Sequence, residues 1–469
     1  MIRTAQTENG TVAGLPADDA RVTVYKGIPF AAPPVSEYRW KAPQPAENWE
    51  GVRNCFEYAP ISMQDQPGIS GDLYCREFHV DPDIPISEDS LYLNVWTGAK
   101  STDDRLPVLV WVYGGAFQWG YTAEPEFNGE RIARHGIVVV TIAYRLGVFG
   151  FLAHSDLVSE DPDHPTNFGL LDQQAALSWV KRNIASFGGD PDNITFAGQS
   201  AGGASVAYGL TNPVTAGMVS RATVLSGFIR DPFIFDELIR AKSLDKACEN
   251  GKDFLENLGC KTISEARSLD AGRIRDAYFE YAKNHPRFVP CLDEKYVKAD
   301  GYDLFIRGDN PDIPLMAGYT KDEFMSTLPT RADMTKEAVK ADITEKCGIK
   351  RFNVIQNSVR NVANAHVRNG KSAPMYVYGF APDIPGDDAP GCFHSCDLWF
   401  WFETLPKCSR PYTGDHYMLA RKMCDYWCNF IKTGDPNGMG YDNRSLPVWN
   451  EISSEDDTAN EMIFTLRLP

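Results

Sequence analysis

The sequence has no apolar run long enough to cross a bilayer, and no apolar core of a secretory leader follows Met1. It also lacks an excess of positive charge, because 46 lysines and arginines stand against 63 aspartates and glutamates, a net charge of −17. A chain with such an excess of acidic residues cannot neutralise phosphate groups. This argues against nucleic acid or an anionic membrane as a partner. These absences predict a cytoplasmic protein.

The cysteines lack the spacing of a metal site. They number eleven, which is odd, and include no C-x-x-C pair. Paired C-x-x-C spacing is typical of zinc sites, and even cysteine counts are typical of disulfide frameworks. We therefore expect reduced thiols, no metal site and no cofactor, and we interpret the N-x-S/T sequons at residues 9–11, 193–195 and 443–445 as accidental.

No Pro/Ser-rich linker, internal repeat or low-complexity tract divides the 469 residues. Strand-like apolar segments alternate with helical patterns throughout, which is typical of an α/β protein whose mostly parallel sheet is covered on both faces. Because sheets of this kind often run long as one unit, we predict a single domain over residues 1–469. Residues 62–86 and 231–282 are candidate insertions that would form the walls and cap of a pocket.

One short segment, Gly198-Gln199-Ser200-Ala201-Gly202, has the G-x-S-x-G pattern of a nucleophile elbow. Residues 194–197 resemble the end of a buried strand, and the small residues at 201–207 can open a helix packed closely against that strand. A bare G-x-S-x-G is often only a glycine-rich turn. The strand before it and the helix after it favour Ser200 as a nucleophile.

A serine that attacks a carbonyl needs hydrogen-bond donors already aimed at the oxyanion. Residues 107–113 form an apolar strand that runs into Gly114-Gly115-Ala116-Phe117, where small side chains let the backbone present N–H groups. We expect an oxyanion hole formed by the N–H groups of Gly115, Ala116 and Ala201. The alternative is that the glycine pair only ends a strand.

A general base and an acid should follow the nucleophile, in α/β-hydrolases in the order acid, then histidine. His394 lies in a loop after the apolar strand 375–380, whereas His416 begins an apparent helix and fits a surface or capping position. Asp322 and Glu323 both follow a strand-like segment at 313–319. Spacing alone leaves either carboxylate open as the acid.

Several longer segments carry further information. They are VYKGIPFAAPP at 24–34, RWKAP at 39–43, SEDSLYLNVW at 87–96, AYRLGVFGFL at 143–152, NFGLLDQ at 167–173 and ASFGGDP at 185–191. In this order they resemble the type-B carboxylesterase and cholinesterase family of α/β-hydrolases, including its bacterial para-nitrobenzyl-esterase-like members. The resemblance runs nearly end to end and implies the α/β-hydrolase fold.

The resemblance also decides what spacing leaves open. It implies Glu323 as the acid and His394 as the histidine of a catalytic triad with Ser200. It implies a second polar shell around them that contains Ser226 and Asp397.

The chain departs from the family pattern at four positions. Ala116 stands where the family often has glycine, Phe324 where it has glycine after the acid, Asp397 where it has glutamate, and Ser90 where it has a cysteine. The methyl group of Ala116 leaves its N–H intact but narrows the space above the oxyanion hole. Ser90 removes a family disulfide.

The resemblance implies a carboxylesterase that acts on small-molecule esters through an acyl-enzyme, without a cofactor. An amide, carbamate or lactone hydrolase with the same triad is an alternative. A non-catalytic binding protein is a further alternative, but such family members typically lack the serine or the histidine that this chain retains. The oligomeric state is not predicted.

Four aromatic residues are candidates for the substrate pocket, namely Trp119, Phe228, Phe288 and Trp399. Aromatic walls bury the apolar groups of an ester and also limit the volume of the pocket. We therefore expect a preference for short or aromatic acyl groups. Residues 399–402 are also candidates for the core, and we expect two of these four to be core residues.

Overall fold

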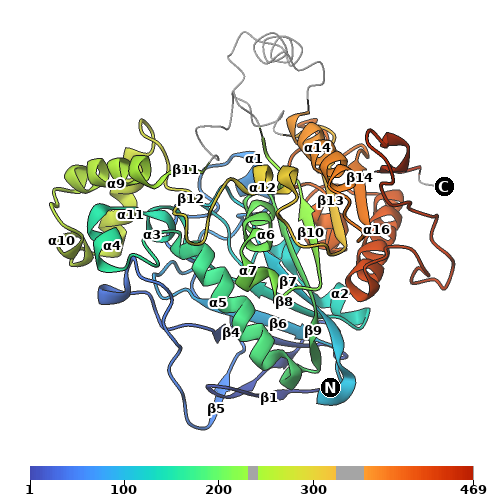
Figure 1. Cartoon of the computed structure of the whole chain (residues 1–469). Helices are drawn as coiled ribbons and strands as arrows, with labels where there is room; N and C mark the ends of the chain where they lie inside the picture. The colour runs from blue at the N-terminus through green and yellow to red at the C-terminus, as the bar shows by residue number, and fades with distance from the viewer. Residues whose placement is uncertain (231–240, 324–352, 468–469) are drawn as a thin grey trace.

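The computed structural model describes residues 1–230, 241–323 and 353–467, and its centre is a ten-stranded sheet (Figure 1). In spatial order the strands are β15 (Met462–Phe464), β14 (Met375–Phe380), β13 (Leu315–Thr320), β10 (Arg221–Leu225), β9 (Gly189–Gln199), β7 (Leu106–Val112), β8 (Val138–Ile142), β6 (Tyr92–Thr97), β4 (Thr23–Pro29) and β3 (Leu15–Pro16). Pairing is parallel from β15 through β8 and antiparallel from β8 to β3. The predicted mostly parallel α/β sheet is confirmed.

The strands expected from the sequence form at the expected places. The segment 107–113 corresponds to β7, 194–197 to the end of β9, 313–319 to β13 and 375–380 to β14. All five residues from Val108 to Val112 are fully buried, because a parallel strand covered on both faces needs apolar side chains on both.

Helices cover both faces of this sheet (Figure 1). On one side lie α5 (Phe168–Asn183) and α6 (Ala201–Thr211), and α12 (Gly301–Arg307) packs against both α6 and α14 (Val354–Arg368). On the other side lie α2 (Glu130–Arg134) and α16 (Gly414–Thr433), with the short helix α15 (Leu398–Trp401) packed against α16. The sheet is therefore the middle layer of the fold.

The remaining elements are short or lie outside the main sheet. Strands β1 (Thr4–Thr7), β2 (Gly10–Ala13) and β5 (Val52–Asn54) form one small sheet, and β11 (Lys242–Ser243) pairs with β12 (Cys291–Leu292). The other α-helices are α1 (Leu73–Glu77), α3 (Gly147–Phe151), α4 (Ser155–Glu160), α7 (Pro213–Ala216), α9 (Leu244–Leu258), α10 (Ile263–Arg267) and α11 (Ala271–Tyr281). Single 3-10 turns occupy Ser36–Tyr38, Thr102–Asp104, Pro125–Phe127, Ile184–Phe187, Leu405–Lys407 and Thr458–Asn460.

The two predicted insertions fall between strands of the sheet. Residues 62–86 lie between β5 and β6 and contain α1. In the second insertion, residues 231–240 lie outside the described residues, and the rest forms β11, α9, α10 and α11 beside α4 (Figure 1). Contacts with α4 fix this group, since Asp156 accepts a hydrogen bond from Ile263 N at 3.1 Å and Glu160 pairs with Arg267 at 2.8 Å.

Ten of the eleven cysteines lie in the described residues, and all ten are free thiols. Cys347 lies outside the described residues. Among the described residues, no helix combines the length and the apolar character that a bilayer crossing requires.

Candidate active site

Ser200 lies on a sharp turn between β9 and α6, as the elbow pattern predicts. Its backbone angles are φ 56° and ψ −124°, a conformation that L-residues rarely adopt. Two backbone hydrogen bonds hold it there, from Ser200 N to Leu225 O at 2.9 Å and from Ala204 N to Ser200 O at 2.8 Å. The strained turn places the serine at the carboxyl end of the central strand.

Glycines on either side of Ser200 let the elbow pack closely. A Cβ on Gly202 would lie 2.1 Å from the carbonyl oxygen of Val112 on β7, and one on Gly198 would lie 2.4 Å from the backbone of Gly202. No side chain fits at either position. The G-x-S-x-G spacing therefore follows from the close approach of α6 to the ends of β7 and β9.

His394 and Glu323 meet at the ends of neighbouring strands. His394 follows β14, Glu323 follows β13, and a hydrogen bond joins His394 Nδ1 to a carboxylate oxygen of Glu323. The other carboxylate oxygen, Oε1, accepts hydrogen bonds from Ser226 Oγ at 2.6 Å and from Thr320 N at 2.8 Å. These donors fix the carboxylate and compensate for its burial.

The second ring nitrogen of His394 faces the elbow. Gln199, directly before Ser200, places its amide nitrogen 3.2 Å from His394 Nε2. If Nδ1 donates to Glu323, Nε2 is an acceptor and receives this N–H. The imidazole thus bridges the acid on one side and the nucleophile turn on the other.

Asp322, the other acid that spacing left open, has a different set of contacts. Its Oδ2 accepts from Cys392 N at 2.9 Å, and its own N–H donates to Cys392 O at 2.9 Å. Asp322 therefore ties the loop that carries His394 to the end of β13, while Glu323 contacts the imidazole.

The three N–H groups predicted for the oxyanion hole lie next to the elbow. Within the described residues, the N–H groups of Gly115, Ala116 and Ala201 donate to no protein acceptor. In the loop after β7, two residues have backbone angles in the left-handed region, with φ 104° at Gly115 and 53° at Ala116. A Cβ on Gly114 would lie only 3.0 Å from Ser200 Cβ, so this loop and the nucleophile turn adjoin.

Asp397 is fully buried near the histidine loop. Its Oδ2 accepts hydrogen bonds from Tyr378 Oη at 2.7 Å and Trp401 Nε1 at 3.2 Å, and its Oδ1 has no hydrogen-bond partner among the described residues. Burial raises the pKa of the Asp397 carboxyl to about 6. Of the two residues assigned by resemblance to a second polar shell, Ser226 contacts the acid directly, whereas Asp397 hydrogen-bonds to Tyr378 and Trp401.

Two of the predicted pocket residues, Trp119 and Phe288, lie beside the oxyanion loop. Trp119 is half-buried, and its ring stacks on Phe279 at 6.3 Å between centroids. The carbonyl of Phe288 accepts a hydrogen bond from Gln118 Nε2 at 2.8 Å, and its buried ring packs on Phe254 at 5.6 Å. Both residues thus connect this loop to the second insertion.

The other two predicted pocket residues are buried. Phe228 packs edge-on against Phe305 at 4.9 Å, and Trp399 stacks on Phe78 at 5.8 Å. All four residues from Trp399 to Phe402 are fully buried, so the expectation that only two of them belong to the core is wrong. They form α15 and the residue after it, which pack under α16 and leave none of the four side chains to solvent.

Sequence reasoning missed three residues at this site, each recognisable only from the fold. Gln199 lies inside the elbow pattern, but its contact with His394 crosses 195 positions of the chain. Tyr74 in the first insertion donates a hydrogen bond to His394 O at 3.3 Å. Gln118 accepts a hydrogen bond from Tyr278 as well as donating to Phe288.

Comparisons with known proteins find relatives over nearly the whole chain. The sequence model described as the carboxylesterase family matches residues 2–357 and 336–467. The para-nitrobenzyl esterase of Bacillus subtilis (strain 168) is 32% identical over 502 residues, covering 97% of this chain and 96% of the relative. The fumonisin B1 esterase of Sphingopyxis macrogoltabida is 31% identical over 474 residues, covering 92% and 82%.

Solved structures show the same fold. The Geobacillus stearothermophilus carboxylesterase at pH 6.8 superposes with a TM-score of 0.81 at 30% identity, covering 99% of this chain and 96% of that one. A para-nitrobenzyl esterase structure superposes with a TM-score of 0.79 at 29% identity, covering 100% and 97%.

Proposed function

The chain belongs to the carboxylesterase family of α/β-hydrolases and is a serine hydrolase of carboxylic esters, and on this premise we propose that Ser200, His394 and Glu323 are its catalytic triad. The observation that carries the assignment is the His394 imidazole, which contacts Glu323 through Nδ1 and, through Nε2, the side chain of Gln199 directly before Ser200. A base held in this way is what a serine nucleophile requires.

The reaction then proceeds in two acyl-transfer steps. His394 Nε2 exchanges its contact with the Gln199 amide for the Ser200 hydroxyl and takes the hydroxyl proton as Oγ attacks the ester carbonyl. Glu323 stabilises the imidazolium that forms. The free N–H groups of Gly115, Ala116 and Ala201 bind the developing oxyanion. The imidazolium returns its proton to the leaving alkoxide, and water later hydrolyses the acyl-enzyme by the same route. These groups complete the chemistry without a cofactor.

The pocket walls come from both insertions of the single domain. In the first, Tyr74 donates a hydrogen bond to the His394 backbone and Phe78 stacks on Trp399. In the second, Phe279 of α11 stacks on Trp119. Contacts with the triad loop and the oxyanion loop support a role of residues 62–86 and 231–282 in shaping the substrate site.

The aromatic set Trp119, Phe228, Phe288 and Trp399 supports a preference for short or aromatic acyl groups. Three of these rings are buried and closely packed, so the acyl pocket that they border would have little room for a long flexible chain. The methyl group of Ala116 further reduces the space for the substrate, because it lies at the end of the site that holds the ester carbonyl. We propose that Phe288 sets the depth of the acyl pocket.

An acyl-length series tests this preference. The kcat/KM for acetate, butyrate, octanoate and palmitate esters of one alcohol should rise about fourfold per methylene while the chain fits, then fall at octanoate or beyond. Phe288→Ala should move the maximum to a longer chain. Phe464→Ala, a buried phenylalanine on the edge strand β15, is the matched control and should leave the profile unchanged. A steady rise through palmitate in the unmodified enzyme would contradict the proposal.

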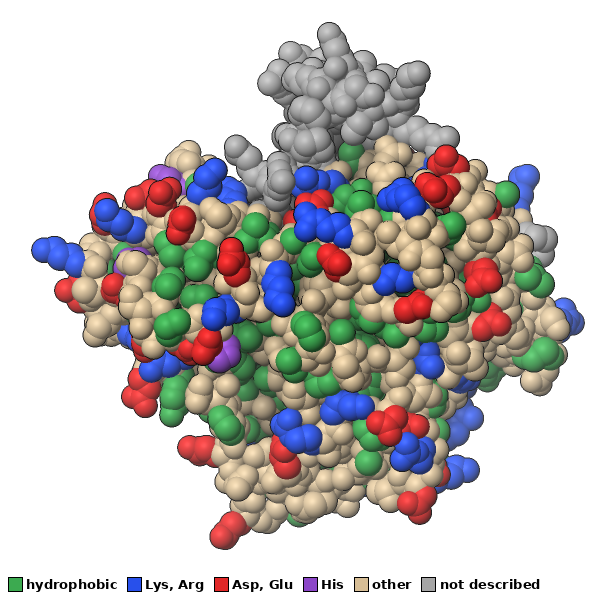
Figure 2. Space-filling view, viewed as in Figure 1, with side chains coloured by type: hydrophobic (Ala, Val, Ile, Leu, Met, Phe, Trp, Pro, Cys, Tyr) green, Lys and Arg blue, Asp and Glu red, His purple; other side chains and the backbone are tan. Residues whose placement is uncertain are grey.

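We propose that this is a bacterial cytoplasmic enzyme, without a nucleic-acid or membrane partner. Its charge of −17 and its ten described free thiols support this assignment, and acidic and basic side chains are interspersed on the face drawn in Figure 2. Thiol titration of the unfolded protein, isolated without reductant and with a chelator present, should detect close to all eleven cysteines. A stable disulfide that involves Cys55 or Cys75 would overturn the assignment.

A further inference from the structure

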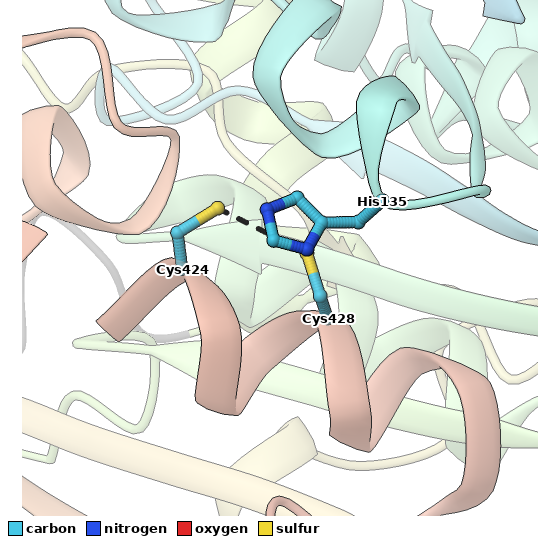
Figure 3. Close-up of side chains that lie close together, drawn as sticks. All are labelled: His135, Cys424 and Cys428. Carbon is cyan, nitrogen blue, oxygen red and sulfur yellow. Dashed lines mark hydrogen bonds between the residues drawn. The ribbon is translucent and has the colours of Figure 1, made fainter. Parts of the chain in front are cut away.

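Three potential metal ligands lie together on the face of the sheet that α16 covers. Cys424 and Cys428 are one turn apart on α16, and His135 is the residue that ends α2 (Figure 3). One ligand atom from each residue lies within 4.8 Å of the others. Figure 3 shows both thiols directed toward the imidazole ring.

The spacing of the two sulfurs fits a tetrahedral metal. Cys424 Sγ lies 3.9 Å from Cys428 Sγ. Two Zn–S bonds of about 2.3 Å at the tetrahedral angle place their sulfurs about 3.8 Å apart. The sulfur–nitrogen separation in such a site is about 3.6 Å, so the ligand atoms, now within 4.8 Å of one another, would have to draw together on binding.

The ligand chemistry selects a thiophilic metal. Two thiolates and an imidazole are typical ligands of Zn²⁺, whereas Mg²⁺ and Ca²⁺ prefer oxygen ligands. The two cysteine side chains are fully buried, and the side chain of His135 is 13% exposed. Buried thiolates that neutralise a divalent cation leave no net charge in the protein interior.

We propose that His135, Cys424 and Cys428 bind one structural zinc ion. Binding forms two Zn–S bonds and one Zn–N bond and releases the two thiol protons to solvent. A water molecule would fill the fourth position, and Asp425, with its Oδ1 3.8 Å from His135 Nδ1, lies beside the cluster and would orient the imidazole. Its other oxygen accepts a hydrogen bond from Tyr441 N at 2.9 Å, which fixes the carboxylate.

An open groove lies next to the residues that surround the cluster. It has a volume of about 830 Å³, and its lining includes Arg421, Asp425 and Tyr441. The Tyr441 ring lies 6.0 Å from the His135 ring. Solvent in the groove is therefore separated from His135 by Asp425 and Tyr441, and a movement of these two side chains would admit the ion.

The ion would join two parts of the chain that are far apart in sequence. His135 follows α2, which packs on β6 and β8, and the cysteines lie on α16, which packs on β7 and β9. Because the three ligands meet only in the folded chain, a metal that binds them would stabilise the fold. The site lies outside the proposed triad, and its role is stability.

Metal content and thermal unfolding of the full chain test this inference. Protein purified in the presence of zinc and then dialysed should retain about one zinc per chain, and its Tm should exceed that of chelator-treated protein by several degrees. Co²⁺ added to the chelated protein should give thiolate-to-cobalt charge-transfer absorption. Cys424→Ala, Cys428→Ala and His135→Ala should each abolish retention and absorption.

Cys55→Ala is the matched control, since Cys55 is a buried free thiol outside the cluster. This variant should still bind one zinc. Ester hydrolysis at 25 °C should persist in every variant that folds, which separates loss of metal from loss of structure. Equal zinc retention by Cys424→Ala, or no retention by the unmodified protein, would show that the cluster is ordinary core packing.

Discussion

Replacing Ser200 or His394 by alanine is expected to lower kcat for ester hydrolysis by about four to six orders of magnitude. Each change removes one partner of the proton transfer from Ser200 to His394. The Nε2 atom of His394 contacts the side chain of Gln199, the residue directly before Ser200. Steady-state kinetics with a chromogenic ester measure the loss. The double variant should lose little more than either single variant, since the two residues act as a unit.

Ser205→Ala is a matched control for this experiment. Ser205 is buried on α6 one turn after the elbow, and its hydroxyl donates to Ala201 O at 2.9 Å. Its removal should change kcat little. Additive losses in the Ser200 and His394 double variant, or substantial turnover by Ser200→Ala, would contradict the proposed triad.

Replacing Glu323 by glutamine should lower kcat by about a thousandfold or more. Glutamine keeps the shape of the side chain but loses the charge that stabilises the imidazolium, and its amide N–H groups no longer fix the histidine tautomer. Its amide oxygen would still accept from Ser226 Oγ, now 2.6 Å from Oε1, which leaves the amide nitrogen facing the imidazole. The ratio of the kcat values of the unmodified enzyme and the variant gives the effect.

Asp322→Asn is the matched comparison, because the two acids are adjacent and only one contacts the imidazole. Asparagine would weaken the hydrogen bond to Cys392 N, now 2.9 Å, and should cost about tenfold or less. If Asp322→Asn were the more damaging change, the assignment of the acid would be wrong.

Much of the fold follows from local pattern. The strands that lead into the glycine loop and the acid, β7 and β13, are continuous apolar runs, and their predicted bounds differ from the observed ones by one or two residues. The exact ends of strands are the hardest to predict from the apolar pattern, because the backbone hydrogen bonds there can also be made by turn residues. The elbow itself was predictable because glycine at 198 and 202 reflects a steric limit that is local to one turn.

Contacts across the sheet were not predictable in the same way. Asp322 and Glu323 have the same chemistry and adjacent positions, and only the path of the chain after β13 decides which one reaches His394. The burial of Trp399 to Phe402 depends on α16, which lies later in the chain. The cluster of His135 with Cys424 and Cys428 has no sequence signature, because its ligands come from opposite halves of the chain.

The order of strands in the sheet has a consequence for synthesis. From β9 outward, β10, β13, β14 and β15 join one edge of the sheet in the same order in which they occur in the chain. Each of these four strands therefore finds its neighbour already made when it leaves the ribosome, whereas β8 has to enter between the earlier strands β7 and β6. In the proposed triad Ser200 precedes β10 and His394 follows β14, so the nascent chain carries the serine before the histidine that would activate it has been made. We therefore expect no ester hydrolysis from a nascent chain that has not yet added β14 and the loop after it.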